Sequence, residues 1–345
     1  MREHSIPGMA VALTRRGQRH FSGYGVASIE SAQAVGERTV FEVGSITKTF
    51  TGLLGGYAVA RGQISLSDPA GKYLPELGSS PIGSISLLDL ATYTAGNLPL
   101  QFPAHVVDFP SMMAFYQGWA PEYPPGSYRR YSNPSIGLFG LLVSRGLGRP
   151  FKELMQQELF PELGLHHTYI DVPASEMQHY AYGYGKAGQP MRVTPGMLDA
   201  EAYGAKTTAP DLLRFIEAHL FTQQLGHTLR GAVKAATTAY YRVGPMQQGL
   251  GWEMYEWPVA FEKLLAGNSA TMALEPNPAS RLSPPVPPSG DSFVNKTGST
   301  GGFGAYAAFV PGAQLGIVML ANKNYPNPAR VKTAYQILKA VAEHA

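Results

Sequence analysis

One serine in the chain has a lysine three residues after it, and this pair could carry out nucleophilic chemistry. The segment reads Ser45-Ile46-Thr47-Lys48, and apolar residues of helical spacing follow it at positions 50, 53, 54 and 57. Residues three apart share one face of a helix, so the two side chains would meet. A lysine can take the proton of a serine when burial or nearby cations lower its pKa. The pair predicts a nucleophile at Ser45, although one Ser-x-x-Lys also arises by chance in 345 residues.

Two further motifs follow this pair along the chain. Lys296-Thr297-Gly298 occurs once, at the end of a predicted strand, where a glycine lets a substrate approach the strand edge closely. The alternative for this motif is a glycine-rich turn with an exposed lysine. Tyr131-Ser132-Asn133 is weaker evidence, because Tyr325-Pro326-Asn327 has the same pattern. All three motifs in this order are much less frequent by chance than any one of them.

Together the motifs resemble those of the penicillin-recognising serine hydrolases, and in detail those of the class C (AmpC-type) β-lactamases. The resemblance covers essentially the whole chain. Its most characteristic stretches are Phe41–Ser45, Leu90–Pro99, Leu198–Gly204, Gly249–Trp252 and Lys296–Arg330. It implies an α+β fold of the β-lactamase/transpeptidase type. In that fold an antiparallel β-sheet is flanked by helices, a second domain is all-helical, and the active site lies at their interface.

The resemblance also implies a role for each site residue. Ser45 would be the acylated nucleophile, and Lys48, Tyr131 and Lys296 would share the proton transfers. The backbone N–H groups of Ser45 and Ser299 would form the oxyanion hole. The residues implied in substrate binding are Gln101, Asn133, Tyr203, Thr297, Gly298, Asn324, Asn327 and Arg330. Asn133 and Gln101 would meet the side-chain amide of the substrate, whereas Asn327 and Arg330 would receive its carboxylate.

The elements that must position these residues follow from the hydrophobic pattern. Strand patterns at both ends of the chain enclose a helical middle section. The strands are expected at 9–14, 20–27, 292–296, 304–310 and 315–321, and the helices at 136–144, 151–159, 211–220 and 328–342. We therefore expect a discontinuous sheet domain over 1–62 and 221–345, and a mainly helical domain over 63–220. The proline-rich segment 283–288 reads as a stiff surface connection, and Arg129-Arg130 as solvated charge.

Composition excludes several classes of function. The chain has no cysteine, so thiol nucleophiles, cysteine metal sites and disulfides are absent. Its nine histidines form no His-x-His or His-Glu-x-x-His pattern, so neither a metal nor another cofactor is expected. A net charge of +3 does not favour nucleic acid, and no apolar run reaches the ~18–20 residues of a membrane span. The expected partner is a small-molecule β-lactam, bound by a monomer.

The expected function is that of a serine β-lactamase, which hydrolyses cephalosporins and penicillins through an acyl-enzyme on Ser45. No glutamate has an asparagine four residues later, as class A enzymes commonly do, and no Gly-x-Ser-x-Gly elbow is present. A D-Ala-D-Ala peptidase or esterase on the same scaffold remains open, as does a non-catalytic β-lactam sensor. The resemblance implies a periplasmic location, although Met1–Pro7 shows no signal peptide. Asn97 stands where many relatives have glycine.

Overall fold

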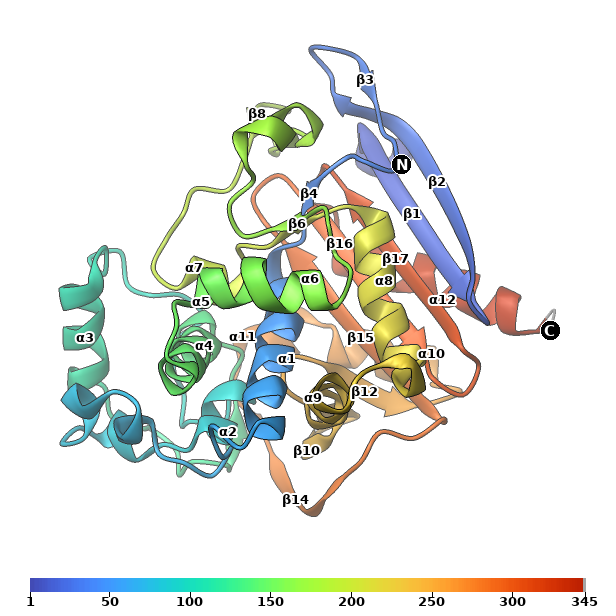
Figure 1. The fold of residues 1–345 in the computed structure, drawn as a ribbon. Coiled ribbons are helices and arrows are strands. Elements are labelled where there is room, and N and C mark those ends of the chain that lie inside the picture. Colours follow the sequence, from blue (N-terminus) through green and yellow to red (C-terminus); the bar gives the residue numbers. More distant parts are fainter. Residues whose placement is uncertain (344–345) are drawn as a thin grey trace.

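Both ends of the chain contribute to one antiparallel sheet, which forms the centre of the molecule (Figure 1). The computed structural model describes residues 1–343, and within them this sheet has ten strands. In spatial order they are β14 (Ser280–Val286), β10 (Ala239–Val243), β11 (Met246–Gln248), β12 (Glu253–Glu256), β15 (Ser292–Ser299), β16 (Gly304–Val310), β17 (Leu315–Ala321), β1 (Gly8–Arg15), β2 (Gln18–Ser28) and β3 (Gln33–Ala34). Because β1 pairs with β17, the predicted sheet shared by the two termini is confirmed, and β1 and β2 pair with each other as a hairpin.

Helices cover both faces of the sheet, and this explains why its central strands are apolar throughout. Every residue of β16 and β17 is buried. On one face α8 (Ala209–Leu220) packs against β1, β16 and β17, with α1 (Thr47–Ala60) and α9 (His227–Thr237) beside it (Figure 1). On the other face α12 (Asn327–Glu343) packs against β16 and β17. Covering both faces removes the alternation of polar and apolar residues that a half-exposed strand shows.

The middle of the chain is mainly helical, and the fold is of the α+β class, as predicted. The remaining α-helices are α2 (Leu87–Ala91), α3 (Phe109–Gly118), α4 (Asn133–Leu147), α5 (Phe151–Glu153), α6 (Phe160–Glu162), α7 (Asp199–Ala202), α10 (Phe261–Gly267) and α11 (Ala270–Leu274), and a π-helical segment, Leu154–Leu159, joins α5 to α6. The short strands are β4 (Phe41–Glu42), β5 (Tyr128–Arg129), β6 (Thr168–Tyr169), β7 (Gly183–Tyr184), β8 (Pro190–Met191), β9 (Lys206–Thr207) and β13 (Asn277–Pro278). Within residues 1–343, none of the helices has the length and apolar character that crossing a bilayer requires.

The proline-rich segment is part of the sheet rather than a free connection. Pro284 and Pro285 lie in β14, which pairs with β10 at the edge of the sheet. An edge strand tolerates proline because its outer side needs no N–H donor for a further strand. The segment is exposed, as predicted, but up to Val286 it is an edge strand rather than a connection.

Helix α8 is the element that fits the proposed division into two domains least well. This helix was assigned to the helical section 63–220, but it packs on the sheet through strands β1, β16 and β17. Gly316 of β17 illustrates the closeness, since a Cβ there would lie 2.6 Å from a methyl of Ile216. The two-domain division stays a prediction, and this packing argues that its second boundary precedes α8.

Candidate active site

The turn that carries Ser45 lies directly against the end of β15. Ser45 belongs to a 3₁₀ turn, η2 (Gly44–Ile46), immediately before α1. Gly44 has φ +49, and a Cβ on it would come within 2.4 Å of the Ser299 carbonyl oxygen. A Cβ on Gly298 would lie 1.9 Å from the carbonyl oxygen of Val43. Two glycines facing each other therefore let the backbones of Ser45 and Ser299 approach, which side chains would prevent.

Lys48 lies on the first turn of α1, with its amine directed at Ser45. Its Nζ donates to Ser45 Oγ at 3.0 Å and to the carbonyl oxygen of Ala202 at 2.7 Å. The side chain is fully buried, and within residues 1–343 no carboxylate forms an ion pair with it. Burial lowers the pKa of Lys48 below its usual range, and the charge of Lys296 acts in the same direction against the opposing effect of Tyr131.

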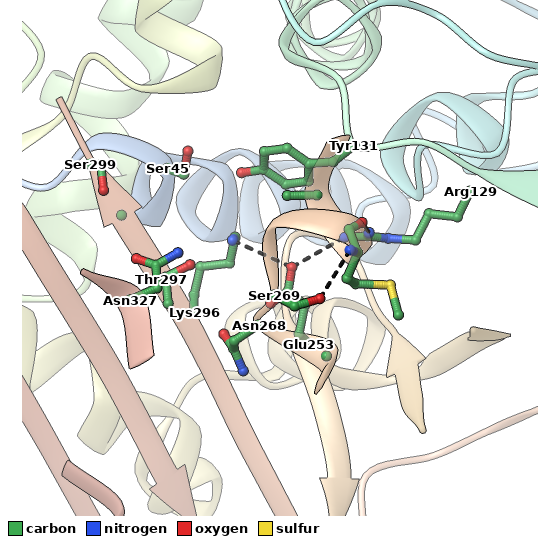
Figure 2. Close-up of a pocket in the computed structure, with 14 residues that line it drawn as sticks. Ser45, Arg129, Tyr131, Glu253, Asn268, Ser269, Lys296, Thr297, Ser299 and Asn327 are labelled. Atoms are coloured by element: carbon green, nitrogen blue, oxygen red, sulfur yellow. Dashed lines mark hydrogen bonds and ion pairs between the residues drawn. The ribbon is translucent and has the colours of Figure 1, made fainter. Parts of the chain in front are cut away.

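Tyr131 brings a phenol close to two lysines. It comes just before Ser132, the N-cap of α4, whose hydroxyl accepts a hydrogen bond from Ser135 N. The Nζ atoms of Lys48 and Lys296 each lie 4.9 Å from the Tyr131 ring centroid. Figure 2 shows the phenol oxygen pointing toward Ser45. Burial disfavours the phenolate, but the positive charges of Lys296 and Lys48 outweigh it, so the pKa of Tyr131 falls below its usual range.

Lys296 forms a buried ionic cluster with two residues that the motifs did not indicate. Its Nζ lies 3.4 Å from Glu253 Oε1, and the same oxygen accepts a hydrogen bond from Arg129 Nη2 at 3.2 Å (Figure 2). All three side chains are buried. Burial alone would lower the pKa of Lys296, but the charge of Glu253 and then of Tyr131 outweigh it, so this pKa is raised. Lys296 is therefore held as a cation.

Arg129 corrects one prediction made from the sequence. It was expected to be solvated charge, but only 1% of it is exposed. Besides Glu253, it donates from Nε to Gln248 Oε1 at 2.8 Å and from Nη1 to the carbonyl oxygen of Met272 at 2.9 Å. Its partners come from β11, β12 and α11, which are distant in sequence, so neighbouring residues gave no signal of its burial.

Two adjoining cavities open in front of Ser45 and bring most of the predicted residues together. They have volumes of about 130 Å³ and 520 Å³, and both are lined by Ser45, Tyr131 and Ser299, so they form one cleft. Beside these shared residues, the smaller cavity is lined by the predicted residues Lys296, Thr297, Gly298 and Asn327. The larger cavity is lined by the predicted residues Gln101, Asn133, Tyr203 and Asn324. Lys48 lines neither cavity but contacts Ser45 directly.

Arg330 lies behind the cleft rather than on its surface. It is fully buried and lines neither cavity. Its Nη1 donates to the carbonyl oxygen of Gly298 at 2.6 Å and to Ser299 Oγ at 2.8 Å, and its Nη2 to Asn324 Oδ1 at 2.7 Å. Burial lowers the pKa of Arg330 to about 10. The expectation of direct contact with a substrate carboxylate does not fit this position, because the guanidinium is engaged in fixing the end of β15.

Asn97 takes over the backbone role for which glycine was expected. Its φ is +87, a left-handed conformation that asparagine tolerates better than most residues. Its Nδ2 donates to Glu122 Oε2 at 2.5 Å, and its Oδ1 accepts from Arg130 Nη1 at 3.1 Å. The loop that leads to Gln101 is therefore held by side-chain contacts that a glycine could not make.

The arrangement can activate a serine hydroxyl and stabilise negative charge without a bound metal. Ser45 has a buried amine within hydrogen-bond distance, a phenol of lowered pKa points toward it, and a buried cation lies beside that phenol. Such a constellation suits acyl transfer to the serine. In the described part of the chain, no group of three His, Cys, Asp or Glu side chains is arranged to hold a metal ion.

Comparison with known proteins agrees with this chemistry over nearly the whole chain. The family model described as "Beta-lactamase" matches residues 1–342. The chain is 52% identical to a "Beta-lactamase" of Pseudomonas fluorescens over 341 residues, which cover 99% of this chain and 95% of that protein.

Solved structures give the same picture at the level of the backbone. A "Beta-Lactamase/D-Alanine Carboxypeptidase" from Pseudomonas syringae has a TM-score of 0.96 at 46% identity, over 98% of this chain and 95% of that one. A "class C beta-lactamase in complex with cefoxitin" has a TM-score of 0.95 at 42% identity, over 99% of this chain and 95% of that one. The chain therefore belongs to the beta-lactamase family, in which it is similar to the class C enzymes.

Proposed function

We propose that this chain is a class C serine β-lactamase, which opens the β-lactam ring of cephalosporins and penicillins by forming an acyl-enzyme on Ser45. The observation that carries the proposal is the buried amine of Lys48, 3.0 Å from Ser45 Oγ, with Tyr131 held beside both. Family membership and the solved neighbour that binds cefoxitin support it.

Acylation begins when Ser45 Oγ attacks the carbonyl carbon of the lactam. The proton of the hydroxyl passes to Lys48 Nζ or to the Tyr131 oxygen, which together form one proton-accepting unit. The lowered pKa of each group makes this transfer easier, because the neutral amine and the phenolate are the forms that accept a proton. When the C–N bond of the ring breaks, the leaving nitrogen takes a proton back from the same unit.

Charge that develops on the carbonyl oxygen would be stabilised by the backbone N–H groups of Ser45 and Ser299. Their backbones are brought together by Gly44 and Gly298. One such donor contributes about 3–4 kcal/mol to transition-state stabilisation. Because Arg330 holds both Gly298 and Ser299 from behind, we assign it to positioning this strand.

The cleft offers separate groups for the two ends of a β-lactam. On one side Lys296, Thr297 and Asn327 line the smaller cavity and would receive the substrate carboxylate. On the other side Gln101 and Asn133 line the larger cavity and would meet the side-chain amide, with Tyr203 as a wall. The Oδ1 atom of Asn133 is buried and has no hydrogen-bond partner within residues 1–343, so it is available to a substrate N–H.

The reaction ends with hydrolysis of the acyl-enzyme. Water attacks the carbonyl carbon of the ester, the bond to Ser45 Oγ breaks, and the serine is free again.

Replacement of the nucleophile tests the proposal. Ser45→Ala is expected to lower kcat for a chromogenic cephalosporin by about 10⁴-fold or more, because alanine has no hydroxyl that could form the acyl-enzyme. The variant should also lose labelling by a fluorescent penicillin. Ser84→Ala, at an exposed serine whose hydroxyl contacts only a local carbonyl, serves as the matched control and should keep both. Hydrolysis at the parental rate by Ser45→Ala would disprove the mechanism.

The lifetime of the acyl-enzyme distinguishes a β-lactamase from a peptidase on the same scaffold. Fast turnover of the cephalosporin, with little release of D-alanine from a D-Ala-D-Ala peptide, is expected here. A penicilloyl adduct that persists for hours in mass spectra would instead assign the chain to the peptidases. We also propose that the enzyme acts as a periplasmic monomer, which the family resemblance supports.

A further inference from the structure

A third cavity lies away from the cleft, between the β1–β2 hairpin and helix α8. Its volume is about 420 Å³, and it shares no lining residue with the two cavities in front of Ser45. Three arginines line it, and each comes from a different element: Arg16 from the hairpin turn, Arg19 from β2 and Arg214 from α8. The proposed reaction at Ser45 uses none of them.

Arg16 occupies a position where the turn itself gives no reason for an arginine. Arg15 pairs with Gln18, so Arg16 and Gly17 are the two central residues of the hairpin, with φ values of +52 and +83. Such two-residue turns favour asparagine followed by glycine, because both central residues need a positive φ. Within residues 1–343 no acceptor is bonded to the Arg16 guanidinium, and its side chain is exposed at the cavity. The turn therefore calls for a residue that tolerates a positive φ and does not itself explain an arginine at this position.

The side chains that line the cavity carry more positive than negative charge. Its single lining carboxylate, Glu217, is already engaged, since Oε1 accepts from Thr14 Oγ1 at 2.8 Å and from Arg19 Nε at 2.9 Å. Its Oε2 also accepts from Arg19. Among residues 1–343, the contacts of the Arg214 guanidinium are long: an ion pair with Asp211 Oδ1 and a bond to the carbonyl oxygen of Gly164, both of 3.4 Å. Arg16 and Arg214 consequently keep donors that no protein group satisfies well.

We propose that this cavity is a binding site for a phosphate-type oxyanion with at least two negative charges. Guanidinium groups present pairs of parallel N–H donors that match phosphate oxygens, so arginines converging from three elements suit this chemistry. Phe221 and Leu163 line the same cavity and leave an apolar surface beside the charges for the body of a phosphate ester. Free phosphate compounds and lipid headgroups share this chemistry.

Titration of the full chain with inorganic pyrophosphate at low ionic strength tests the site. We expect saturable binding by calorimetry, which weakens as NaCl is added because the attraction is electrostatic. Arg16→Gln and Arg214→Gln should each weaken binding by about tenfold or more. Arg145→Gln removes the same charge from an exposed position on α4, outside all of these cavities, and should leave binding unchanged.

Two results would overturn the proposal. One is equal affinity in Arg16→Gln, Arg214→Gln and Arg145→Gln; the other is no binding to the parent at millimolar pyrophosphate. Vesicles of phosphatidylcholine with and without phosphatidic acid separate the two sources of phosphate: retention only on acidic vesicles, lost in Arg16→Gln, identifies a lipid headgroup. Hydrolysis of a cephalosporin by Arg16→Gln should match the parent, so the outcome is independent of the proposed function.

Discussion

Lys48 and Lys296 each place their amine 4.9 Å from the ring centre of Tyr131, and both side chains are buried. Their surroundings differ in one respect. Lys48 is bonded to a hydroxyl and a backbone carbonyl, whereas Lys296 faces the carboxylate of Glu253 at 3.4 Å. The pKa of Lys48 is lowered and that of Lys296 is raised. Burial is common to both, so the presence of a counter-charge decides the direction.

This difference divides the work between two identical side chains. A lysine without a counterion can lose its proton and serve as a base, while a lysine paired with glutamate keeps its charge for an anionic substrate group. Arg129 belongs to the surroundings of Lys296, because the carboxylate of Glu253 forms ion pairs with both side chains. The comparison predicts that the two sides of the cleft respond differently to substitution.

The largest expected effect follows from removing the base. Lys48→Met should lower kcat for a cephalosporin by about 10²–10⁴-fold, the usual contribution of a general base, while the folded structure persists. Lys206→Met is the matched control: its amine is also buried and donates to a carbonyl oxygen, that of Ile170, but it lies outside the cleft. Steady-state rates of both variants test the assignment. A loss of less than about tenfold in Lys48→Met would contradict the role of Lys48.

The second effect concerns stability rather than rate. Glu253→Gln keeps the shape of the side chain but leaves Lys296 and Arg129 buried without a negative partner. We expect the free energy of unfolding to fall by about 3–5 kcal/mol, as measured when one member of a buried ion pair is removed. Urea unfolding of this variant should be compared with Glu176→Gln, which breaks a more exposed pair with Arg38 and should lose less than about 1 kcal/mol. Equal losses of unfolding free energy in the two variants would show that the buried cluster stabilises the fold no more than an exposed ion pair does.

The parts of the site that could be predicted from the sequence are those that depend on local spacing. Ser45 and Lys48 meet because residues three apart share a helix face, and the observed 3.0 Å contact needs no long-range information. The strands 304–310 and 315–321 were recognisable from continuous apolar runs. Tyr131 and Lys296 needed the order of motifs and the family resemblance, because neither residue is informative by itself.

Other parts depend on tertiary packing and left no local signal. Glu253 and Arg129 belong to no motif, and their 3.2 Å contact joins residues that are 124 positions apart in the chain. The family resemblance placed Arg330 at the substrate carboxylate, yet its buried guanidinium bonds to four backbone and side-chain groups behind the cleft. The position of α8 on the sheet likewise depends on contacts with β17, which lies about a hundred residues further along the chain.

The pH dependence of stability gives the smallest effect and the sharpest contrast between the two lysines. An unfolded lysine titrates near pH ~10.4. Because the pKa of folded Lys48 lies below this value, the unfolded state binds more protons between the two pKa values, and stability rises with pH in that window. Lys296 behaves oppositely: its raised pKa gives a contribution that is present below pH ~10.4 and is lost as pH rises through the folded value.

Urea unfolding over the alkaline range, for the parent and for Lys48→Met and Lys296→Met, separates these contributions. Each lysine changes the slope by at most about 1.4 kcal/mol per pH unit. Lys48→Met should flatten the rise below pH ~10.4, and Lys296→Met should flatten the fall above it. The lowered pKa of Tyr131 adds to the rise on the lower side, so Tyr131→Phe should resemble Lys48→Met rather than Lys296→Met. If both lysine variants altered the same side of the profile, the counter-charge of Glu253 would not be what distinguishes the two lysines.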